Sequence, residues 1–371
     1  MDAYEYSAEE RQALLPWLAV SVPIPPAPLA NRLPERVRGM LLGLAVGDSL
    51  GNTSEGMNPA ERRDIHGLAH GDKDGDIRDY LPNRREDERP VGLPSDDTQL
   101  AFWTVESLLR KRGLDPVDLA TTFTRQDRIY GIGSSVTSFL LAYRFGEKRW
   151  FEAGQPSAGN GALMRIAPIV LPHLRTMGGD LWRDTVVATA LTHKDEAAVA
   201  ASVGFVGLLA EIIALPAGRL PAPAWWPETF VRYARWVETG AHYGCRAAND
   251  PFHGSLCDRV EQTVFEAIET NTSVAKAADA WFSGAYLLET VPCVLLLLAR
   301  HAESAEEAIV RAVNDTWDND TTAAIVGAAV GALHGVDGLP ARWLDGLLGR
   351  TREADDGRVQ RLVEKAVETF L

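Results

Sequence analysis

The sequence predicts an all-α protein, and its apolar pattern supports this in three ways. Apolar residues recur every three to four positions through most of the 371-residue chain, which is the spacing of amphipathic helices. Almost no segment alternates apolar and polar residues as a half-buried strand does, and no fixed repeat of about 20 to 50 residues indicates a solenoid. The expected helices are 8–15, 36–50, 97–111, 115–124, 133–145, 182–192, 196–215, 255–270, 274–281, 286–299, 304–313, 321–335 and 358–370.

The first 35 residues are interpreted as an extension that precedes one domain, residues 36–371. The run 22–28 is rich in proline, which lacks an amide donor and clashes with a preceding helical turn, so it is expected to be a stiff extended connector. We expect residues 1–35 to pack on the domain as an arm. An arm that contacts a partner protein is the alternative.

The first helix of the domain, residues 36–50, carries a stripe of small residues. Gly39, Gly43 and Gly47 stand at every fourth position and therefore lie on one face of the helix. A smooth stripe of this kind lets a second helix approach closely. We therefore expect a tight helix–helix contact here.

Charge and composition exclude several classes of protein. The net charge of -14 repels phosphate backbones and disfavours general nucleic-acid binding. The three cysteines include no C-x-x-C pair, which argues against a disulfide framework or a thiolate metal site. Residues 1–5 lack the basic region of a signal peptide, and the longest apolar run, about 291–299, is too short to span a bilayer. The expectation is a cytoplasmic protein without membrane contact.

Two segments between the helices are expected to be irregular. Residues 56–92 are polar and charged and are interpreted as a loop or lid. Their acidic stretch 71–76 resembles a calcium loop, but no glutamate follows at the twelfth position, so a solvated loop is the preferred interpretation. The insert 216–252 is rich in proline and tryptophan, and its tryptophans are expected to belong mostly to the core.

Two acidic clusters stand where helices begin: Ser-Asp-Asp-Thr at 95–98 and Asp-Asn-Asp-Thr at 318–321. Capping a helix needs one acid, but each cluster supplies two. The helix after the second cluster is almost entirely apolar and hence expected to be buried, and no lysine or arginine lies near this cluster in the sequence. A hard divalent cation would satisfy these acids, and an all-oxygen ligand set favours Mg²⁺, Mn²⁺ or Ca²⁺ over zinc. If the clusters meet, their four carboxylates suffice for two ions.

These clusters and several further motifs resemble the ADP-ribosylglycohydrolase family, which includes the enzyme that reactivates dinitrogenase reductase. The resemblance spans about residues 36–335. Each motif alone is weak, but the set in this order is very specific. The motifs are GMLLGLAVGDSLG at 39–51, SDDT at 95–98, GIG at 131–133, SAGNGALMRIAP at 157–168, TH at 192–193, AVN at 312–314 and DNDTTAAI at 318–325.

The resemblance implies a compact orthogonal helical bundle with two Mg²⁺ ions, for which Mn²⁺ is an alternative. Glu55 falls where many members carry a mobile glutamate near the metals, and residues 159–164 match the region that holds the diphosphate. The implied metal ligands are Ser95, Asp96, Asp97, Asp318, Asp320 and Thr321. The implied substrate-binding residues are Gly131, Gly133, Ser157, Gly159, Asn160, Gly161, Met164 and His193.

Three residues keep two interpretations each. Asp48 is either a second layer behind the metals or a hydrogen-bond partner at a helix end, and Arg165 either contacts phosphate or forms a structural ion pair. His193 either lines the ADP-ribose cleft or is a hydrogen-bonded structural histidine. Most members carry Gly-Gly where this chain has Thr316 and Trp317. Glycines allow close approach of a ligand to the backbone, so Trp317 is expected to shape or narrow the cleft and to affect acceptor preference.

The resemblance implies a hydrolase that cleaves the N- or O-glycosidic bond between ADP-ribose and a modified acceptor. Breaking that bond builds positive charge on the ribose. We expect two metal ions to hold the ribose and a water, and Asp97 or Glu55 to accept the water's proton; the sequence does not choose between them. Arginine, serine, a nucleic-acid base and free ADP-ribose derivatives all remain open as acceptors, and the oligomeric state is not predicted.

Two other functions remain open at this stage. One is an immunity or binding protein that blocks an ADP-ribosyltransferase partner through residues 1–35. The other is a metal-dependent hydrolase that cleaves the diphosphate itself. The intact acids favour an enzyme, and the products, free ADP-ribose or AMP with ribose phosphate, distinguish the two hydrolases.

Overall fold

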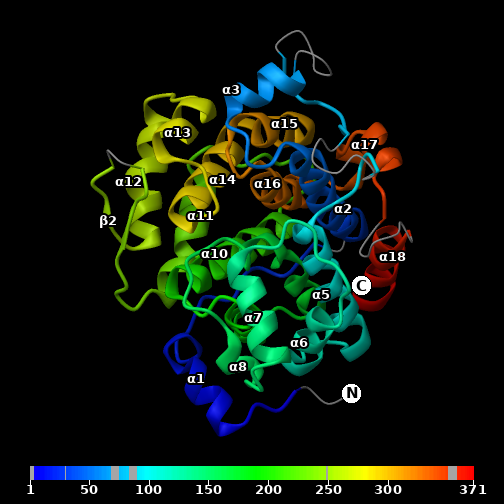
Figure 1. Cartoon of the computed structure of the whole chain (residues 1–371), viewed down its shortest axis with the longest axis vertical. Helices are drawn as coiled ribbons and strands as arrows, with labels where there is room; N and C mark the ends of the chain where they lie inside the picture. The colour runs from blue at the N-terminus through cyan, green and yellow to red at the C-terminus, as the bar shows by residue number, and fades with distance from the viewer. Residues whose placement is uncertain (1–3, 30, 68–74, 83–89, 248–249, 350–356) are drawn as a thin grey trace.

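The computed structural model describes residues 4–29, 31–67, 75–82, 90–247, 250–349 and 357–371. Within them the chain is helical apart from one short antiparallel hairpin, β1 (Tyr243–Gly244) with β2 (His253–Gly254), so the predicted all-α class is confirmed (Figure 1). The α-helices are α1 (Ala8–Leu18), α2 (Leu33–Gly51), α3 (Pro59–Arg62), α5 (Asp96–Lys111), α6 (Pro116–Thr124), α7 (Ser134–Arg144), α8 (Trp150–Ala153), α9 (Asp180–Ala190), α10 (Glu196–Ala214), α11 (Trp225–Ala234), α12 (Leu256–Glu269), α13 (Val274–Trp281), α14 (Leu287–His301), α15 (Ala305–Asp315), α16 (Asn319–His334), α17 (Ala341–Gly346) and α18 (Arg358–Phe370).

The sequence pattern located the long helices and missed the short ones. Every expected helix is present, with ends displaced by at most three residues. The missed helices α3, α8 and α17 are too short to show a periodic apolar face. The fourth, α11, begins in a proline-rich segment, but its Pro227 stands in the first turn, where the missing amide has no helical partner to lose. The insert 216–252 is therefore partly helical.

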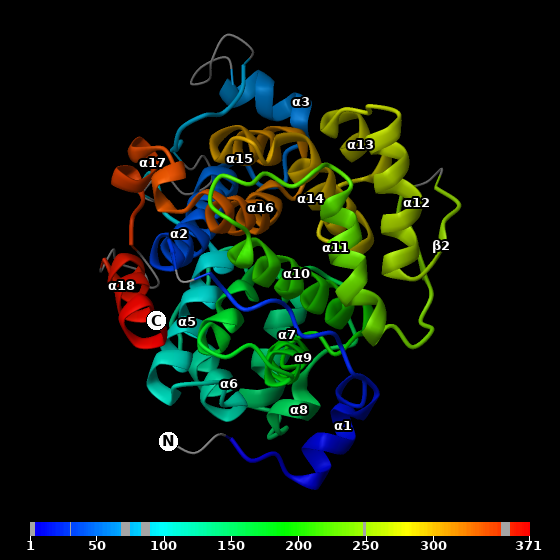
Figure 2. The same cartoon turned by 180° about the vertical axis from the view of Figure 1, so that it is seen from behind.

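Helices α2 and α16 lie side by side at the centre of the molecule (Figures 1 and 2). A Cβ atom on Gly43 would stand 2.2 Å from the backbone oxygen of Gly327, and one on Gly39 would stand 2.2 Å from that of Gly331. The helices run antiparallel and touch backbone to backbone, so the close approach predicted from the glycine stripe is confirmed. This contact brings the C-terminal end of α2 against the N-terminal end of α16, where Gly51 meets Asp320.

Helix α10 crosses the core. By length and composition it is the one described helix that is apolar enough to cross a membrane, but 89% of its apolar window is buried inside the protein. Core helices of soluble proteins meet the same criteria, so α10 is weak evidence for a membrane span. Its position beside α9, α11 and α16 accounts for its apolar composition.

The N-terminal extension packs on the domain. Helix α1 contacts α8 and α9, and Leu14 is completely buried. The Glu10 carboxylate accepts hydrogen bonds from the Trp150 indole N–H at 2.7 Å and from the Tyr4 hydroxyl at 2.7 Å. One side of residues 4–29 thus packs against the domain of the same chain, as expected of a packing arm.

The described residues of the polar segment 56–92 make more contacts with the domain than a solvated loop would. The segment contains α3, and Asp76 is not a solvated residue: it is 4% exposed and forms ion pairs with Arg311 and Arg63. Next to it, Ile77 is buried and its amide donates to the Asn314 side chain at 2.8 Å. The interpretation of 71–76 as a solvated loop is wrong at Asp76, because its basic partner Arg311 is remote in sequence; residues 71–74 lie outside the described part of the chain.

Candidate functional site

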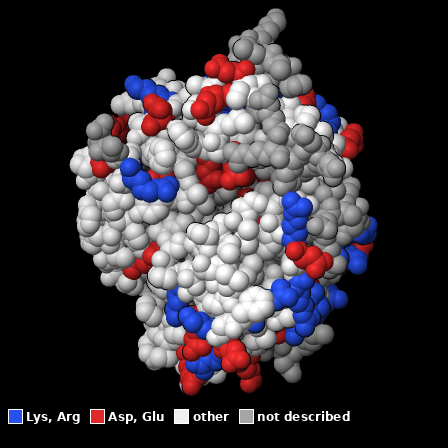
Figure 3. Space-filling view, viewed as in Figure 1, with Lys and Arg blue, Asp and Glu red and all other residues white. Residues whose placement is uncertain are grey.

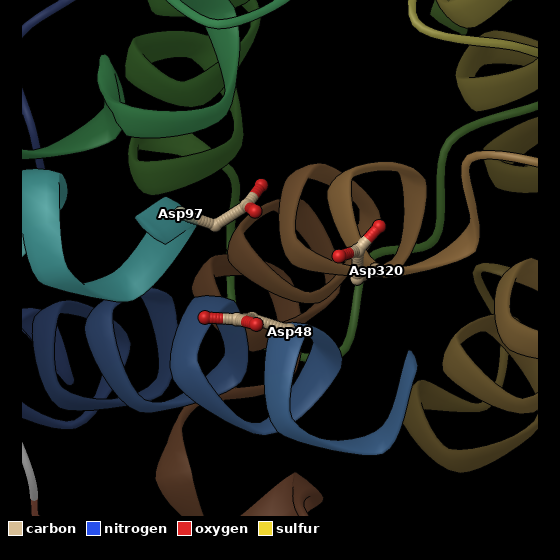
Figure 4. A group of neighbouring side chains, drawn as sticks. All are labelled: Asp48, Asp97 and Asp320. Atoms are coloured by element: carbon tan, nitrogen blue, oxygen red, sulfur yellow. The ribbon is translucent and has the colours of Figure 1, made fainter. Parts of the chain in front are cut away.

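Acidic side chains from three helix ends meet in a hollow on one face of the molecule (Figures 3 and 4). Oxygens of Asp48 at the end of α2, Asp97 at the start of α5 and Asp320 at the start of α16 all lie within 4.8 Å of one another. A second group, Glu55, Asp318 and Asp320, satisfies the same limit. Asp320 belongs to both groups, so the acids form one continuous cluster. The two acidic segments, far apart in sequence, converge.

Asp48 fixes the first segment in place. Its carboxylate accepts hydrogen bonds from the backbone amides of Ser95 and Thr98, at 2.9 and 3.0 Å, and from the Ser95 hydroxyl at 2.5 Å. The side chain of Ser95 makes no capping bond of its own, so a carboxylate from α2 caps α5 instead. Asp48 thus forms helix-end hydrogen bonds, which was one of its two expected roles. One of its carboxylate oxygens also lies within 4.8 Å of an Asp97 oxygen.

The second segment is held by two amide side chains. Asn160 donates to the Asp318 carboxylate at 2.5 Å and to the Thr290 hydroxyl at 3.0 Å. Asn319 donates to the Gly51 carbonyl at 3.1 Å, which ties this segment to the end of α2. The Thr321 amide donates to the Asp320 carboxylate at 2.9 Å. These bonds determine where the acids of residues 318–321 point.

The cluster is electrostatically strained without a cation. Burial, reinforced by the charge of Asp48, raises the pKa values of Asp96 and Asp97 well above the usual range. Burial and then the charge of Glu55 do the same to the pKa of Asp320, and burial raises that of Asp318. The shared cause is that several carboxylates occupy one dry space.

No basic side chain within the described residues relieves this strain by direct pairing. No lysine or arginine there forms an ion pair with Asp48 or with the acids at 96, 97, 318 and 320. The buried guanidinium of Arg62 is close enough to Asp320 for their charges to interact, but it donates to neutral oxygens, including the Thr316 carbonyl at 2.9 Å. The Asp97 Oδ1 atom is buried without a hydrogen-bond partner. A buried all-oxygen set with an unsatisfied carboxylate oxygen fits a hard divalent cation.

A cavity of about 310 Å³ opens above the acids. All eight residues predicted to bind substrate line it, together with Glu55 and every predicted metal ligand except Ser95. Ser95 lies behind the wall, 2% exposed, with its hydroxyl on Asp48. The predicted lining residues are Gly131, Gly133, Ser157, Gly159, Asn160, Gly161, Met164 and His193.

The glycines of the cavity wall allow close contacts that a side chain would block. Gly131 has a φ of +76°, and a Cβ there would stand 3.0 Å from the Asp96 carboxylate. A Cβ on Gly161 would stand 3.0 Å from the His193 ring. The Gly159 amide donates to the Ser157 hydroxyl at 3.2 Å. The loop 157–161 therefore wraps closely around the imidazole.

His193 is neutral and presents a donor to the cavity. Burial, with a smaller contribution from the Arg165 charge, lowers the pKa of His193 to about 3. Its Nδ1 lies 2.9 Å from the Thr192 hydroxyl, which itself accepts from Arg165 at 2.6 Å. If Thr192 donates onward to Nδ1, that nitrogen is the acceptor and the ring proton sits on Nε2, beside Gly159 and Gly161. Arg165 is completely buried and also donates to the Ala188 carbonyl, so it supports this pair and does not line the cavity.

Sequence reasoning missed several lining residues: Ser134, Ser135, Val136, Arg246 and Ala285. Ser134 and Ser135 directly follow a predicted lining glycine at a helix start, which is a usable signal. Arg246 lies in the insert and carries no local motif. Only its tertiary contacts bring it to the cavity.

Trp317 stands beside the cavity but does not line it. Its amide donates to the Ser283 hydroxyl at 3.0 Å, and its ring packs on Phe282 with centroids 5.2 Å apart. Thr316 is buried, and its hydroxyl donates to the Ala312 carbonyl at 2.7 Å. The two residues that replace Gly-Gly therefore support loop side chains at the edge of the cavity and do not face its interior.

Several known proteins are similar to this chain in sequence or in fold. A profile described as ADP-ribosylglycohydrolase matches residues 29–370. The ADP-ribosyl-[dinitrogen reductase] glycohydrolase of Rhodospirillum rubrum is 25% identical over 347 residues, 91% of this chain and 96% of that protein. The ADP-ribosylarginine hydrolase Tri1 of Pseudomonas putida (strain GB-1) is 26% identical over 321 residues, 84% of this chain and 74% of that protein. A solved structure of an ADP-ribosylglycohydrolase-related protein complex has a TM-score of 0.64 and 27% identity, and the match covers 92% of this chain and 98% of that one.

Proposed function

The chain belongs to the ADP-ribosylglycohydrolase family, and from that premise we propose that it hydrolyses the glycosidic bond between ADP-ribose and a modified acceptor. One observation carries the proposal. The acidic segments 95–97 and 318–321 meet at the floor of a cavity that all eight candidate substrate-binding residues line. A cluster of buried carboxylates and the glycine loop 157–161 thus lie around one small space.

We propose that two Mg²⁺ ions, or Mn²⁺ in their place, bind at this floor. Asp96, Asp97, Asp318, Asp320 and Thr321 line the cavity and would hold them, and Ser95 would contribute from behind Asp97. When bound, such ions supply Lewis-acid chemistry and offset the charge of the crowded carboxylates. The raised pKa values of the acids and the unsatisfied Asp97 Oδ1 support this assignment.

Of the two candidate bases, Glu55 suits the role better. Asp97 is 1% exposed and lies at the helix start beside Ser95 and Asp48, as a metal ligand should. Glu55 lines the cavity, is partly exposed, and has a carboxylate oxygen within 4.8 Å of those of Asp318 and Asp320. A water that enters the cavity can give its proton to Glu55 as it attacks the anomeric carbon. The acceptor then leaves with the electrons of the glycosidic bond.

The wall of the cavity suits the diphosphate. The loop 157–161 has glycines at 159 and 161, whose backbones a ligand can approach without a blocking side chain. Because its pKa is low, His193 is uncharged near neutral pH, and in this tautomer its Nε2–H group can donate to a phosphate oxygen. These groups would orient the ribose over the acidic floor.

The test is release of ADP-ribose from a panel of acceptors: arginine-linked, serine-linked and nucleic-acid-linked. Wild-type protein should release free ADP-ribose with Mg²⁺ and lose this activity with chelator. Glu55→Gln should slow release by about 10²- to 10⁴-fold, the usual contribution of a general base. Asp337→Asn, which changes a carboxylate that is 74% exposed and paired with Arg32, is the matched control and should leave release unchanged.

The products decide between the proposal and its rivals. AMP with ribose phosphate would instead identify a diphosphate hydrolase. No release from any acceptor, with binding to an ADP-ribosyltransferase that requires residues 1–35, would identify a binding protein.

A further inference from the structure

Arg246 is the one cationic side chain that lines the cavity within the described residues. His193 also lines it, but its low pKa leaves it uncharged near neutral pH. The remaining charged groups of the lining are carboxylates, so the positive charge of Arg246 has no counterpart there. No sequence motif singles out this residue, which lies in the loop after β1.

The guanidinium of Arg246 is held in one orientation. The Glu289 side chain, completely buried, accepts from its Nε at 2.8 Å and from its Nη2 at 2.6 Å. The rings of Tyr286 and Phe282 lie 5.1 and 5.6 Å from the guanidinium carbon. This two-point ion pair occupies one edge of the guanidinium, and Nη1 has no hydrogen-bond partner in the described chain. The side chain remains 49% exposed, so the free edge is accessible.

Arg246 also stands on the same wall as the glycine loop. Tyr286, on which it packs, pairs with Gly159 in an antiparallel bridge, and the next amide, that of Leu287, donates to the Ala158 carbonyl at 3.0 Å. Arg246 is near enough to Asp318 that its charge offsets part of the rise in pKa that burial imposes on Asp318. The arginine thus packs on the bridge partner of the glycine loop and lies close to an acid of the floor.

We propose that the free edge of Arg246 binds the diphosphate of the ADP-ribosyl group. The inference rests on the proposed function and adds a specific anchor to it. A guanidinium matches phosphate oxygens in shape and charge, and an arginine already fixed by a buried carboxylate loses little freedom on binding. A diphosphate that approaches five lining carboxylates needs such an attraction.

The test is calorimetric binding of ADP-ribose and of adenosine, which lacks phosphate, to the whole protein with Mg²⁺. Arg246→Gln alone would leave Glu289 buried without its partner, so the informative variant is Arg246→Gln/Glu289→Gln. Its affinity for ADP-ribose should fall about 10- to 100-fold, the range for a charge-assisted hydrogen bond. Its affinity for adenosine should stay within about twofold if only the phosphate contact is lost.

Arg232→Gln/Glu211→Gln is the matched control. Arg232 is also 49% exposed and paired with a glutamate, Glu211 at 3.0 Å, but it does not line the cavity. This double variant loses the same pair of charges and should bind ADP-ribose as the wild type does. Thermal unfolding of each variant shows whether it is folded.

Three outcomes would overturn the inference. The first is an unchanged ADP-ribose affinity in the double variant, and the second is an equal loss of affinity for adenosine. The third is a change seen only in the release assay and only for one acceptor, which would assign Arg246 to acceptor binding. Each leaves the proposed function intact. Wild-type protein that fails to bind ADP-ribose with Mg²⁺ would instead sink the proposed function itself.

Discussion

The floor and the rim of the cavity are built in different ways. The floor consists of the acids at the starts of α5 and α16. The end of α2 supports them through backbone contacts with α16 and through the Asp48 cap on α5. The rim, here Arg246, Phe282 and Trp317, consists of loop side chains that rest on one another. The floor therefore tolerates little change, whereas the rim can vary without moving the acids. In many enzymes specificity resides in such loops, on a scaffold that keeps the chemistry.

The largest expected effect comes from breaking the backbone contact beneath the floor. Gly43→Val places a branched side chain where even a Cβ meets the Gly327 oxygen at 2.2 Å, so α2 and α16 must separate. We expect a loss of about 3 kcal/mol or more in the free energy of unfolding, the upper range for overpacking a core. Denaturant unfolding measures it. Gly178→Val, at a glycine with nothing within 4 Å, is the control and should be nearly neutral.

A smaller effect should appear when the metal-free protein is titrated. The folded protein holds protons on Asp96, Asp97 and Asp320 at pH values where the unfolded chain, with ordinary aspartate pKa values near 3.8, has lost them. Stability is therefore full below that value and falls as pH rises through the raised pKa values. Where the folded cluster as a whole holds one proton more than the unfolded chain, the fall is about 1.4 kcal/mol per pH unit.

Calorimetric melting between pH 5 and pH 8 in chelator measures this fall, and Mg²⁺ should abolish most of it. Asp320→Asn removes one of the repelling carboxylates, so at pH 8 without metal it should melt higher than the wild type while losing activity. If the melting temperature of the metal-free wild type stays constant or rises over this range, the proposed repulsion among the buried carboxylates is contradicted.

The smallest effect is expected at the rim. Trp317→Ala removes the ring that supports Phe282 and, through it, Arg246. We expect KM for an ADP-ribosylated protein to change a few-fold, within about 1 kcal/mol, with kcat and Mg²⁺ dependence preserved. Trp317→Phe, which keeps an aromatic ring, should be closer to wild type. Equal losses in kcat and in Mg²⁺ affinity would show that floor and rim are not separable here.

Sequence reasoning predicted the floor far better than the rim, and the reason is local chemistry. Asp96, Asp97, Asp318 and Asp320 stand in short motifs at helix starts, and the glycines of α2 show their spacing directly. Arg246 carries no such pattern, because its place depends on Glu289 and Tyr286, which lie some forty residues further along the chain. Asp76 was misjudged for the same reason. The Asp48 cap was one of two open interpretations, since no pattern shows which remote amides a carboxylate will meet.

The pairing of α2 with α16 also constrains how the protein is made. Residues 95–97 emerge early from the ribosome, but their partners at 318–321 follow only after most of the chain has been synthesised. A contact between such distant segments forms late in folding, because the long intervening loop must first close. A nascent chain thus lacks a complete acidic cluster until α16 emerges. A product truncated before Asp318 would carry half of the proposed cation ligands and would lack α16, the helix that packs against them.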